Sequence, residues 1–186
     1  MKIDYGFVFQ WIFVTFIGFL VSLYWVEVGE QADIWIVESA VGGAVIGSAQ
    51  WFAIAKRISQ AGWWILACVV GWVLLGSSGI GAFGWVAPNT SYIPFRIAAG
   101  IVGGIQVGIV LGLAQWLVLR TQFSQAWQWV VASCGGWAAG LACAWGIGGI
   151  LRGVTRLFLG DVIGLVLGWM VVAAITGLAL CLFEEL

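Results

Sequence analysis

Hydrophobic residues along the chain gather into six long runs that are separated by short polar stretches. Each run holds about 20 residues, and at about 1.5 Å per residue a helix of that length crosses a hydrocarbon core of roughly 30 Å. The runs are continuously apolar and lack the alternation of barrel strands, so helices are favoured. The pattern predicts an all-α integral membrane protein, with a single transmembrane domain over 1–186. About six transmembrane helices are expected, near residues 6–26, 35–55, 63–81, 97–119, 127–147 and 161–183.

One block of sequence occurs twice, as AQWFAIAKRISQAGWW at 49–64 and as AQWLVLRTQFSQAWQW at 114–129. The same offset of 65 residues (114 − 49) places Gly47 on Gly112, and the match continues without a gap across two runs and the turn between them. Such persistence is typical of an internal repeat. The repeated unit is predicted to be a glycine-rich helix, a polar turn and a second helix that begins with tryptophan.

The first and last runs fit the same unit. Residues 10–18 resemble residues 128–136, and residues 164–168 resemble residues 108–112. The six runs are therefore interpreted as three repeated helix hairpins that point the same way. This order predicts a pseudo-threefold bundle about an axis along the membrane normal, closed by the sixth run beside the first.

Small residues and an amide share one face of each repeated glycine-rich helix, at steps of four and three: Gly43, Gly47 and Gln50, and again Gly108, Gly112 and Gln115. Small-xxx-small faces let helix backbones approach closely in lipid, and an amide one turn further on is expected to hydrogen-bond across the contact. Indoles favour the membrane–water interface. The tryptophans that begin the other helices are therefore expected at the depth of the lipid headgroups: Trp11, Trp64 and Trp129.

Composition supports a membrane environment. The chain is 63% hydrophobic and 8% charged, with a mean hydropathy of +1.09, whereas soluble domains carry roughly 25% charged residues. A net charge of −1 gives no basic surface for nucleic acid. The chain has no histidine, which is the commonest metal ligand, and its four cysteines lie within apolar runs. No metal site and no catalytic arrangement is predicted, so the protein is not expected to be an enzyme.

Polar residues within the runs are candidates for a ligand site or a pathway. Glu38 lies about one turn into the second run, where it is either a functional carboxylate in the membrane or an N-terminal acid near the headgroups. Gln106, in the fourth run, either faces a cavity or bonds a neighbouring backbone. Gln50 and Gln115 are further candidates, and a packing role is favoured for both. The last run places Val171 at the matching position, which argues against a ring of three amides.

Arg96, Arg152 and Arg156 are candidates for contacts with an anionic headgroup or substrate. Arg152 and Arg156 lie near Asp161 in the connection between the fifth and sixth runs, where they fit either a short amphipathic interfacial helix or an anion site. Arg96 ends the longest connection, 81–96, which carries both prolines. We expect an ordinary surface connection there, rather than a cap or a re-entrant segment.

The basic residues also indicate an orientation. The three arginines described above are expected on one side of the membrane. The other four basic residues are expected on the opposite side: Lys2, Lys56, Arg57 and Arg120. By the positive-inside rule this small excess predicts cytoplasmic termini. The expected location is an inner (plasma) or thylakoid-type bacterial membrane, with membrane lipids as partners.

The sequence pattern G-x-x-x-G-x-A-Q-W continues with W-x-x-L-R at 116–120 and a following A-x-x-W. With this pattern the chain resembles Gly- and Trp-rich multi-pass membrane proteins of cyanobacterial type. The resemblance covers most of the chain and transfers no function. Three hairpins about a pseudo-threefold axis are also similar in architecture to mitochondrial carriers. The carrier signature Pro-x-Asp/Glu-x-x-Lys/Arg is missing from this sequence, so no carrier chemistry is inferred.

Two functions are expected. The first is a non-catalytic membrane protein that binds a hydrophobic or amphipathic ligand such as a lipid, quinone or pigment, or that serves as an accessory subunit of a membrane complex or homo-oligomer. Its 14 Trp and 11 Phe would supply aromatic walls. The alternative is a small-solute transporter or channel-like permease with a site between the repeats. A transporter predicts a water-accessible cavity lined by the polar candidates, whereas a binding or accessory protein predicts a dry centre.

Overall fold

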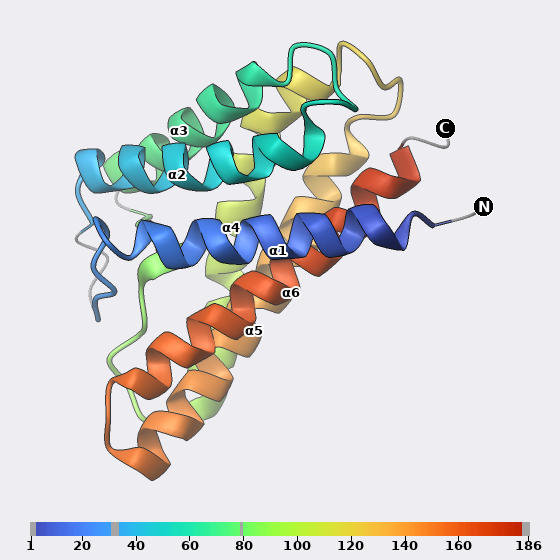
Figure 1. Ribbon diagram of the computed structural model, residues 1–186. Coiled ribbons are helices and arrows are strands. Elements are labelled where there is room, and N and C mark those ends of the chain that lie inside the picture. Colours follow the sequence, from blue (N-terminus) through green and yellow to red (C-terminus); the bar gives the residue numbers. More distant parts are fainter. Residues whose placement is uncertain (1–2, 31–33, 79, 184–186) are drawn as a thin grey trace.

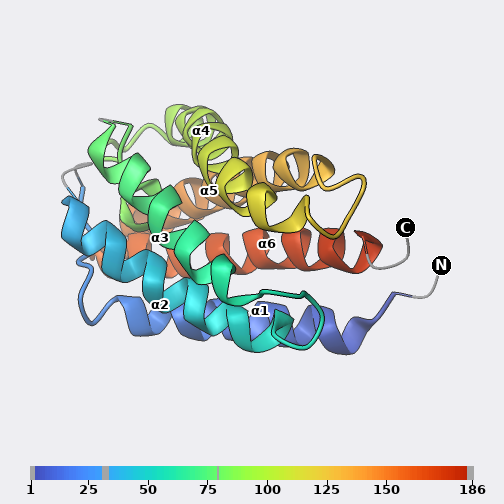
Figure 2. The same ribbon diagram turned by 90° about the horizontal axis from the view of Figure 1, so that it is seen from above.

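The computed structural model describes residues 3–30, 34–78 and 80–183 of the chain. These residues form α-helices and a short 3₁₀ helix, η1, which begins at Phe83 and ends at Trp85 (Figure 1). The α-helices are α1 Tyr5–Ser22, α2 Ile36–Ile54, α3 Gly62–Ser77, α4 Ile93–Leu119, α5 Gln128–Thr155 and α6 Leu159–Phe183. Each helix packs against the next one along the chain, and α6 returns beside α1 (Figure 2). The all-α prediction is confirmed.

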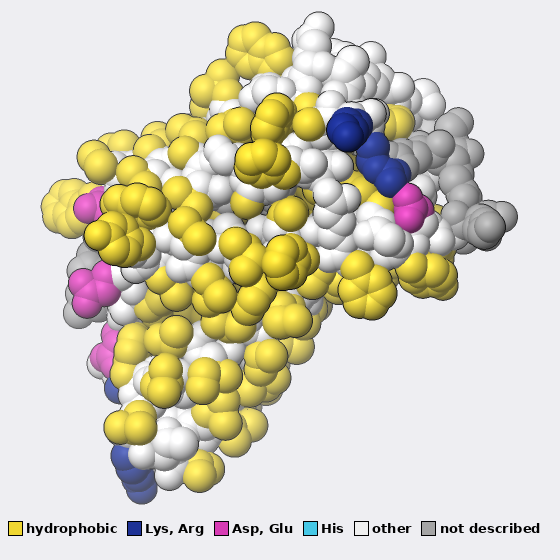
Figure 3. Space-filling model, viewed as in Figure 1, with side chains coloured by type: hydrophobic (Ala, Val, Ile, Leu, Met, Phe, Trp, Pro, Cys, Tyr) yellow, Lys and Arg dark blue, Asp and Glu magenta, His cyan; other side chains and the backbone are white. Residues whose placement is uncertain are grey.

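Four of these helices are long and apolar enough to cross a membrane: α1, α4, α5 and α6. At 16 residues α3 is apolar but short, and the apolar run of α2 is interrupted by Glu38 and Gln50. Charged side chains gather toward the two ends of the face seen in Figure 3, and hydrophobic side chains cover its middle. This distribution is typical of a helical membrane protein, because charges avoid the hydrocarbon layer.

The connections alternate between two ends of the bundle (Figure 1). The start of α1, the end of α6 and the α2–α3 and α4–α5 connections lie together, at what we name the turn end. The α1–α2, α3–α4 and α5–α6 connections lie at the opposite, loop end. Neighbouring helices therefore run in opposite directions around the bundle.

Glycine faces bring the helices together as predicted. A Cβ added at Gly47 would lie 2.9 Å from Cys68 Cβ on α3, and one added at Gly112 would lie 3.1 Å from Ser133 Cβ on α5. The contact partners thus shift by the same 65 residues (133 − 68) as the glycines themselves. The bundle is nevertheless uneven, because α4, α5 and α6 approach one another over a greater length than α1, α2 and α3 do.

Two predicted boundaries were wrong at the loop end. The α5 helix continues well past residue 147 to Thr155, so Arg152 lies in its last turn and there is no interfacial helix between α5 and α6 in the described chain. Arg156 then ends α5 in the left-handed conformation, with a φ of 63°. At the other boundary α4 begins at Ile93, because Pro94 fits the first turn of a helix, where no backbone N–H is needed.

The connection between α3 and α4 is not an ordinary surface loop, contrary to the prediction. Its residues 82–87, which we name the plug segment, enter the loop end of the bundle, and Trp85 is completely buried there. The Trp85 indole donates to Ser22 Oγ at 2.8 Å. Indoles from α5 and α6 in turn donate to backbone oxygens of the plug, Trp145 to Val86 O at 2.7 Å and Trp169 to Gly84 O at 2.8 Å.

Candidate functional site

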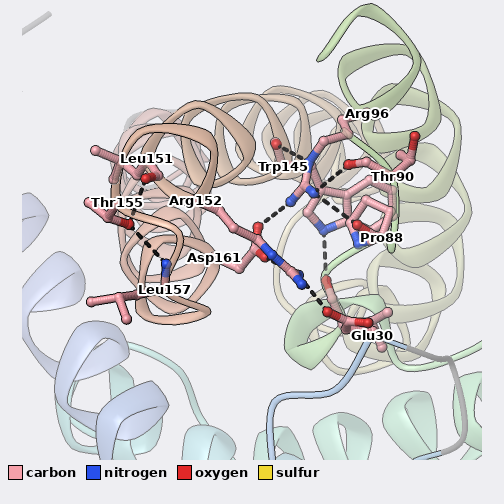
Figure 4. Close-up of polar contacts among 11 residues, drawn as sticks. Glu30, Pro88, Thr90, Arg96, Trp145, Leu151, Arg152, Thr155, Leu157 and Asp161 are labelled. Atoms are coloured by element: carbon pink, nitrogen blue, oxygen red, sulfur yellow. Dashed lines mark hydrogen bonds and ion pairs between the residues drawn. The ribbon is translucent and has the colours of Figure 1, made fainter. Parts of the chain in front are cut away.

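A buried arginine holds the plug segment and the neighbouring loop in place (Figure 4). Arg96, in the first turn of α4, donates from Nε to Trp145 O at 2.6 Å. One terminal nitrogen donates to Pro88 O at 2.8 Å and to Thr90 O at 3.0 Å, and the other donates to the Asp161 carboxylate. Only 1% of the Arg96 side chain and none of the Asp161 side chain is exposed. Arg96 therefore ties the α3–α4 connection to both α5 and α6.

Asp161 connects this arginine to a second ion pair. Its other carboxylate oxygen accepts from Arg152 at 3.0 Å, and Arg152 also contacts Glu30 Oε1 at 2.5 Å. Two positive and two negative side chains thus form one network of zero net charge. Gly149 makes room for it, since a Cβ at that position would lie 2.6 Å from Arg96 Nε.

The three arginine candidates have different positions. Four hydrogen bonds occupy four of the five donors of the Arg96 guanidinium, and its charge is already paired with Asp161 at a buried position, which disfavours a further anionic ligand. Arg152 is one-third exposed at the edge of the network. The Arg156 side chain is exposed, and its backbone N–H donates to Arg152 O at 2.8 Å where α5 ends.

The candidate amides Gln50 and Gln115 make the same hydrogen bond in each copy of the repeat. Trp64 Nε1 donates to Gln50 Oε1 at 3.0 Å, and Trp129 Nε1 donates to Gln115 Oε1, also at 3.0 Å. Each pair is 14 residues apart in sequence. The third tryptophan, Trp11, donates to Thr176 Oγ1 at 3.0 Å. The three indoles are buried and donate inside the bundle, so their N–H groups do not face lipid headgroups, and their depth in the membrane stays a prediction.

Further bonds join the two Trp–Gln pairs, and the Trp11 and Trp64 ring centroids lie 5.9 Å apart, so that one layer reaches every helix. Gln115 Nε2 donates to Cys68 Sγ at 3.3 Å, and this thiol donates to Gln50 Oε1 at 3.8 Å. Gln50 Nε2 in turn donates to Thr15 Oγ1 on α1 at 3.3 Å. We name these residues, with the three tryptophans and Thr176, the amide–tryptophan layer. The residue that α6 contributes is Thr176, which lies five positions after Val171, the apolar residue that the repeat aligns with the two amides.

The interior beside this layer is nearly full. A cavity of about 20 Å³ remains there, and its walls include Gln50, Gln115 and Thr176. That volume is about enough for one water molecule. Aromatic rings fill the space between the layer and the plug segment, with centroids 5.5 Å apart for Trp72 and Trp137 and 4.8 Å apart for Trp137 and Trp169.

An apolar groove with a volume of about 660 Å³ lies between α3 and α4. Its walls are aliphatic along most of its length and include Val70 on α3 and Leu113 on α4. Two polar side chains, Gln60 and Thr121, lie at its turn end. Ligand pockets in proteins are typically about 300–1,000 Å³.

The remaining two candidates lie outside these sites. Glu38 is in the first turn of α2, half-buried beside a hollow that Glu27 and Glu30 also line. Its Oε2 atom is buried and accepts no hydrogen bond from the described residues. The position agrees with an N-terminal acid that the helix dipole favours. Gln106 is exposed on the outer surface of α4.

Sequence reasoning missed Glu30, Asp161 and Thr176 as members of these networks. The described residues contain no group of three His, Cys, Asp or Glu side chains placed to bind a metal ion. Comparisons of the chain with protein-family models, with curated proteins and with solved structures find no match.

Proposed function

We propose that the protein is a non-catalytic, multi-pass membrane protein that binds a hydrophobic or amphipathic, lipid-like ligand in the groove between α3 and α4. The observation that carries this proposal is the groove itself, whose volume of about 660 Å³ far exceeds the cavity of about 20 Å³ at the bundle centre. A quinone, pigment or lipid chain fits the first volume and not the second.

The chemistry of the groove suits an amphipathic molecule with one polar end. Its aliphatic walls match an acyl or isoprenoid chain, and Gln60 and Thr121 offer hydrogen bonds to a headgroup at the turn end. Arg120 is close to this end, with its guanidinium carbon 5.1 Å from the centre of the Trp116 ring. A positive charge beside the polar end favours an anionic headgroup.

We further propose that all six helices cross the membrane, as three hairpins of one repeated unit. The alternating connections and the identical Trp–Gln bonds of the two repeat copies support this arrangement. In this arrangement α3 is shorter than a typical membrane span, and the polar turn before it lies at the membrane surface. We place the turn end, with the termini, on the cytoplasmic side of a bacterial inner or thylakoid-type membrane, because Lys56, Arg57 and Arg120 are exposed there.

A transport function has less support. A path through the centre would have to displace the indoles of Trp72, Trp137 and Trp169, which contact one another. Arg96, the deepest of the arginine candidates, is already occupied by Asp161 and by three carbonyl oxygens.

Native mass spectrometry of the protein released from mild detergent tests the ligand proposal. We expect the wild-type protein to retain one lipid-class molecule and Val70→Trp, which fills the groove, to lose it. Val131→Trp adds the same ring at an exposed position on α5, outside the groove, and is expected to keep the ligand. Equal retention by the two variants, or a wild-type protein with nothing bound, would contradict the proposal.

A further inference from the structure

Gln106 holds an unusual position among the polar residues of the bundle. It lies at the middle of α4, 13 residues from Ile93 (106 − 93) and 13 residues from Leu119 (119 − 106). At about 1.5 Å per residue each end of the helix is roughly 20 Å away. The side chain is exposed on the outer surface and makes no hydrogen bond with any residue that the structure describes. With α4 crossing the membrane as proposed above, this amide faces the middle of the hydrocarbon layer.

Lipid tails cannot satisfy this amide. A polar group of this kind costs roughly 2–7 kcal/mol when it is moved from water to an apolar medium without a hydrogen-bond partner. The glutamine side chain is too short to reach headgroups from the centre of α4. By contrast, the other two helix amides at candidate positions, Gln50 and Gln115, are both hydrogen-bonded inside the bundle. Gln106 is thus placed for a partner outside the chain.

The surroundings of Gln106 indicate what kind of partner this is. Val102, Gln106, Ile109 and Leu113 follow one another at steps of four, three and four, and all four side chains are exposed. This spacing is that of a coiled-coil seam, in which apolar residues repeat every 3.5 positions on average. One polar residue within such a seam fixes the register and the number of helices. We name these four residues the α4 seam.

We propose that the α4 seam is the interface of a homodimer in which two Gln106 amides exchange hydrogen bonds. A carboxamide both donates and accepts, so it is complementary to its own copy. A twofold axis along the membrane normal places identical residues at identical depths, which brings Gln106 opposite Gln106 when α4 lies at the axis. A different protein would need its own polar group at this depth, whereas a second copy supplies it automatically.

The dimer and the ligand groove are neighbours, because Leu113 belongs to both the α4 seam and the groove wall. The dimer proposal does not depend on a bound ligand. The two proposals are separated by measuring ligand retention and subunit association in the same Gln106→Leu protein. We expect this variant to keep its ligand while its dimer dissociates more easily.

Energy transfer between labelled copies in phosphatidylcholine vesicles, measured over a range of protein-to-lipid ratios, tests the dimer. We expect the wild-type protein to dimerise and Gln106→Leu to dimerise about tenfold more weakly, the scale of a hydrogen bond between membrane helices. Gln10→Leu changes an exposed amide near the start of α1 and is expected to behave as wild type. A monomeric wild-type protein, or a Gln106→Leu variant that associates as strongly as wild type, would overturn the proposal.

A cross-linking measurement keeps the proposal testable if Gln106→Leu folds poorly. Val102→Cys places a thiol on the α4 seam one turn from Gln106, and Val131→Cys places one on the exposed face of α5. In vesicles treated with a mild oxidant, we expect Val102→Cys to form a disulfide-linked dimer and Val131→Cys not to do so. Equal cross-linking at the two positions would contradict the assigned face.

Discussion

The hairpins α2–α3 and α4–α5 carry the two similar blocks of sequence, yet they pack to different extents. Both hairpins contain the Trp–Gln hydrogen bond at 3.0 Å, and in both of them two glycines of the first helix contact the second helix closely. In α4 the glycine face continues for two more turns, and a Cβ at Gly100 would lie 2.6 Å from Leu141 O. At the matching positions the first hairpin has Trp35, which directly precedes α2, and Ser39 (100 − 65 and 104 − 65).

The difference separates the role of the amide and the tryptophan from the role of the glycine face. The amide and the tryptophan set the local register, so they are the same in both copies. The length of the glycine face sets how far two backbones stay in contact, because a side chain larger than hydrogen separates them. The backbones of α4 and α5, which are 27 and 28 residues long, therefore stay together over more turns than those of α2 and α3, which are 19 and 16 residues long.

The largest effect is expected from the ion pair that anchors the longer copy. In Asp161→Asn the Arg96 charge stays buried without its counter-charge, and breaking a buried pair in this way typically costs about 3–5 kcal/mol of stability. Unfolding in mixed detergent micelles, followed by circular dichroism, measures the change. Glu30→Gln alters the partly exposed end of the same network and is expected to cost less than about 1 kcal/mol. Similar losses in both variants would contradict a special role for the buried pair.

The glycine faces provide the second prediction. A Cβ at Gly104 would lie 2.6 Å from Ala138 Cα, which belongs to the rigid backbone of α5. Gly43 has more room, with its closest contact at 2.9 Å to Cys68 O. We expect Gly104→Ala to lose about 1–3 kcal/mol, as overpacked sites do, and Gly43→Ala to lose less in the same unfolding measurement. The reverse order would show that glycine face length does not explain the difference between the copies.

The shared hydrogen bonds should respond equally. Gln115→Leu leaves the Trp129 N–H without its acceptor, and Gln50→Leu does the same to Trp64. Each variant is expected to lose about 1–2 kcal/mol, because a buried donor is left unpaired. The comparison of the two unfolding free energies is the test. A clear loss in only one copy would mean that the repeated bond is not equivalent in the two hairpins.

The smallest effect concerns the turns. In the first copy Arg57 donates to Asp4 Oδ2 at 2.5 Å, and this bond, helped by the Phe7 N–H, holds the pKa of Asp4 below its ordinary value. At the matching position the second copy has Gln122 (57 + 65), which bonds the Ser59 backbone without charge.

Because the pKa of Asp4 is lowered in the folded state, its stabilising effect is complete above the ordinary pKa of about 4 and is lost as the pH falls through the folded value. Asp4→Asn should remove this part of the pH dependence, whereas Gln122→Leu should leave it unchanged. Unfolding midpoints of the two variants, measured between neutral and acid pH, test this expectation. A pH dependence that survives in Asp4→Asn would contradict the assignment.

Periodicity and small-residue spacing were sufficient to predict the helices and the glycine interfaces, because both depend on residues close together in sequence. The plug segment and the Arg96–Asp161 pair could not be predicted in the same way, since their partners lie on different helices and depend on how these are turned. Trp64 and Trp129 illustrate this limit. A tryptophan beside a polar turn suits the headgroup region, but the buried Gln50 and Gln115 offer its N–H a better partner.

An electron-density map of the protein crystallised in a lipid environment would show whether the groove between α3 and α4 holds a lipid-like ligand. We expect elongated density along Val70 and Leu113, with its polar end beside Gln60 and Thr121 and better order than the surrounding lipid. A groove closed by direct contact of α3 with α4, or one filled only by disordered lipid, would rule out such a ligand site.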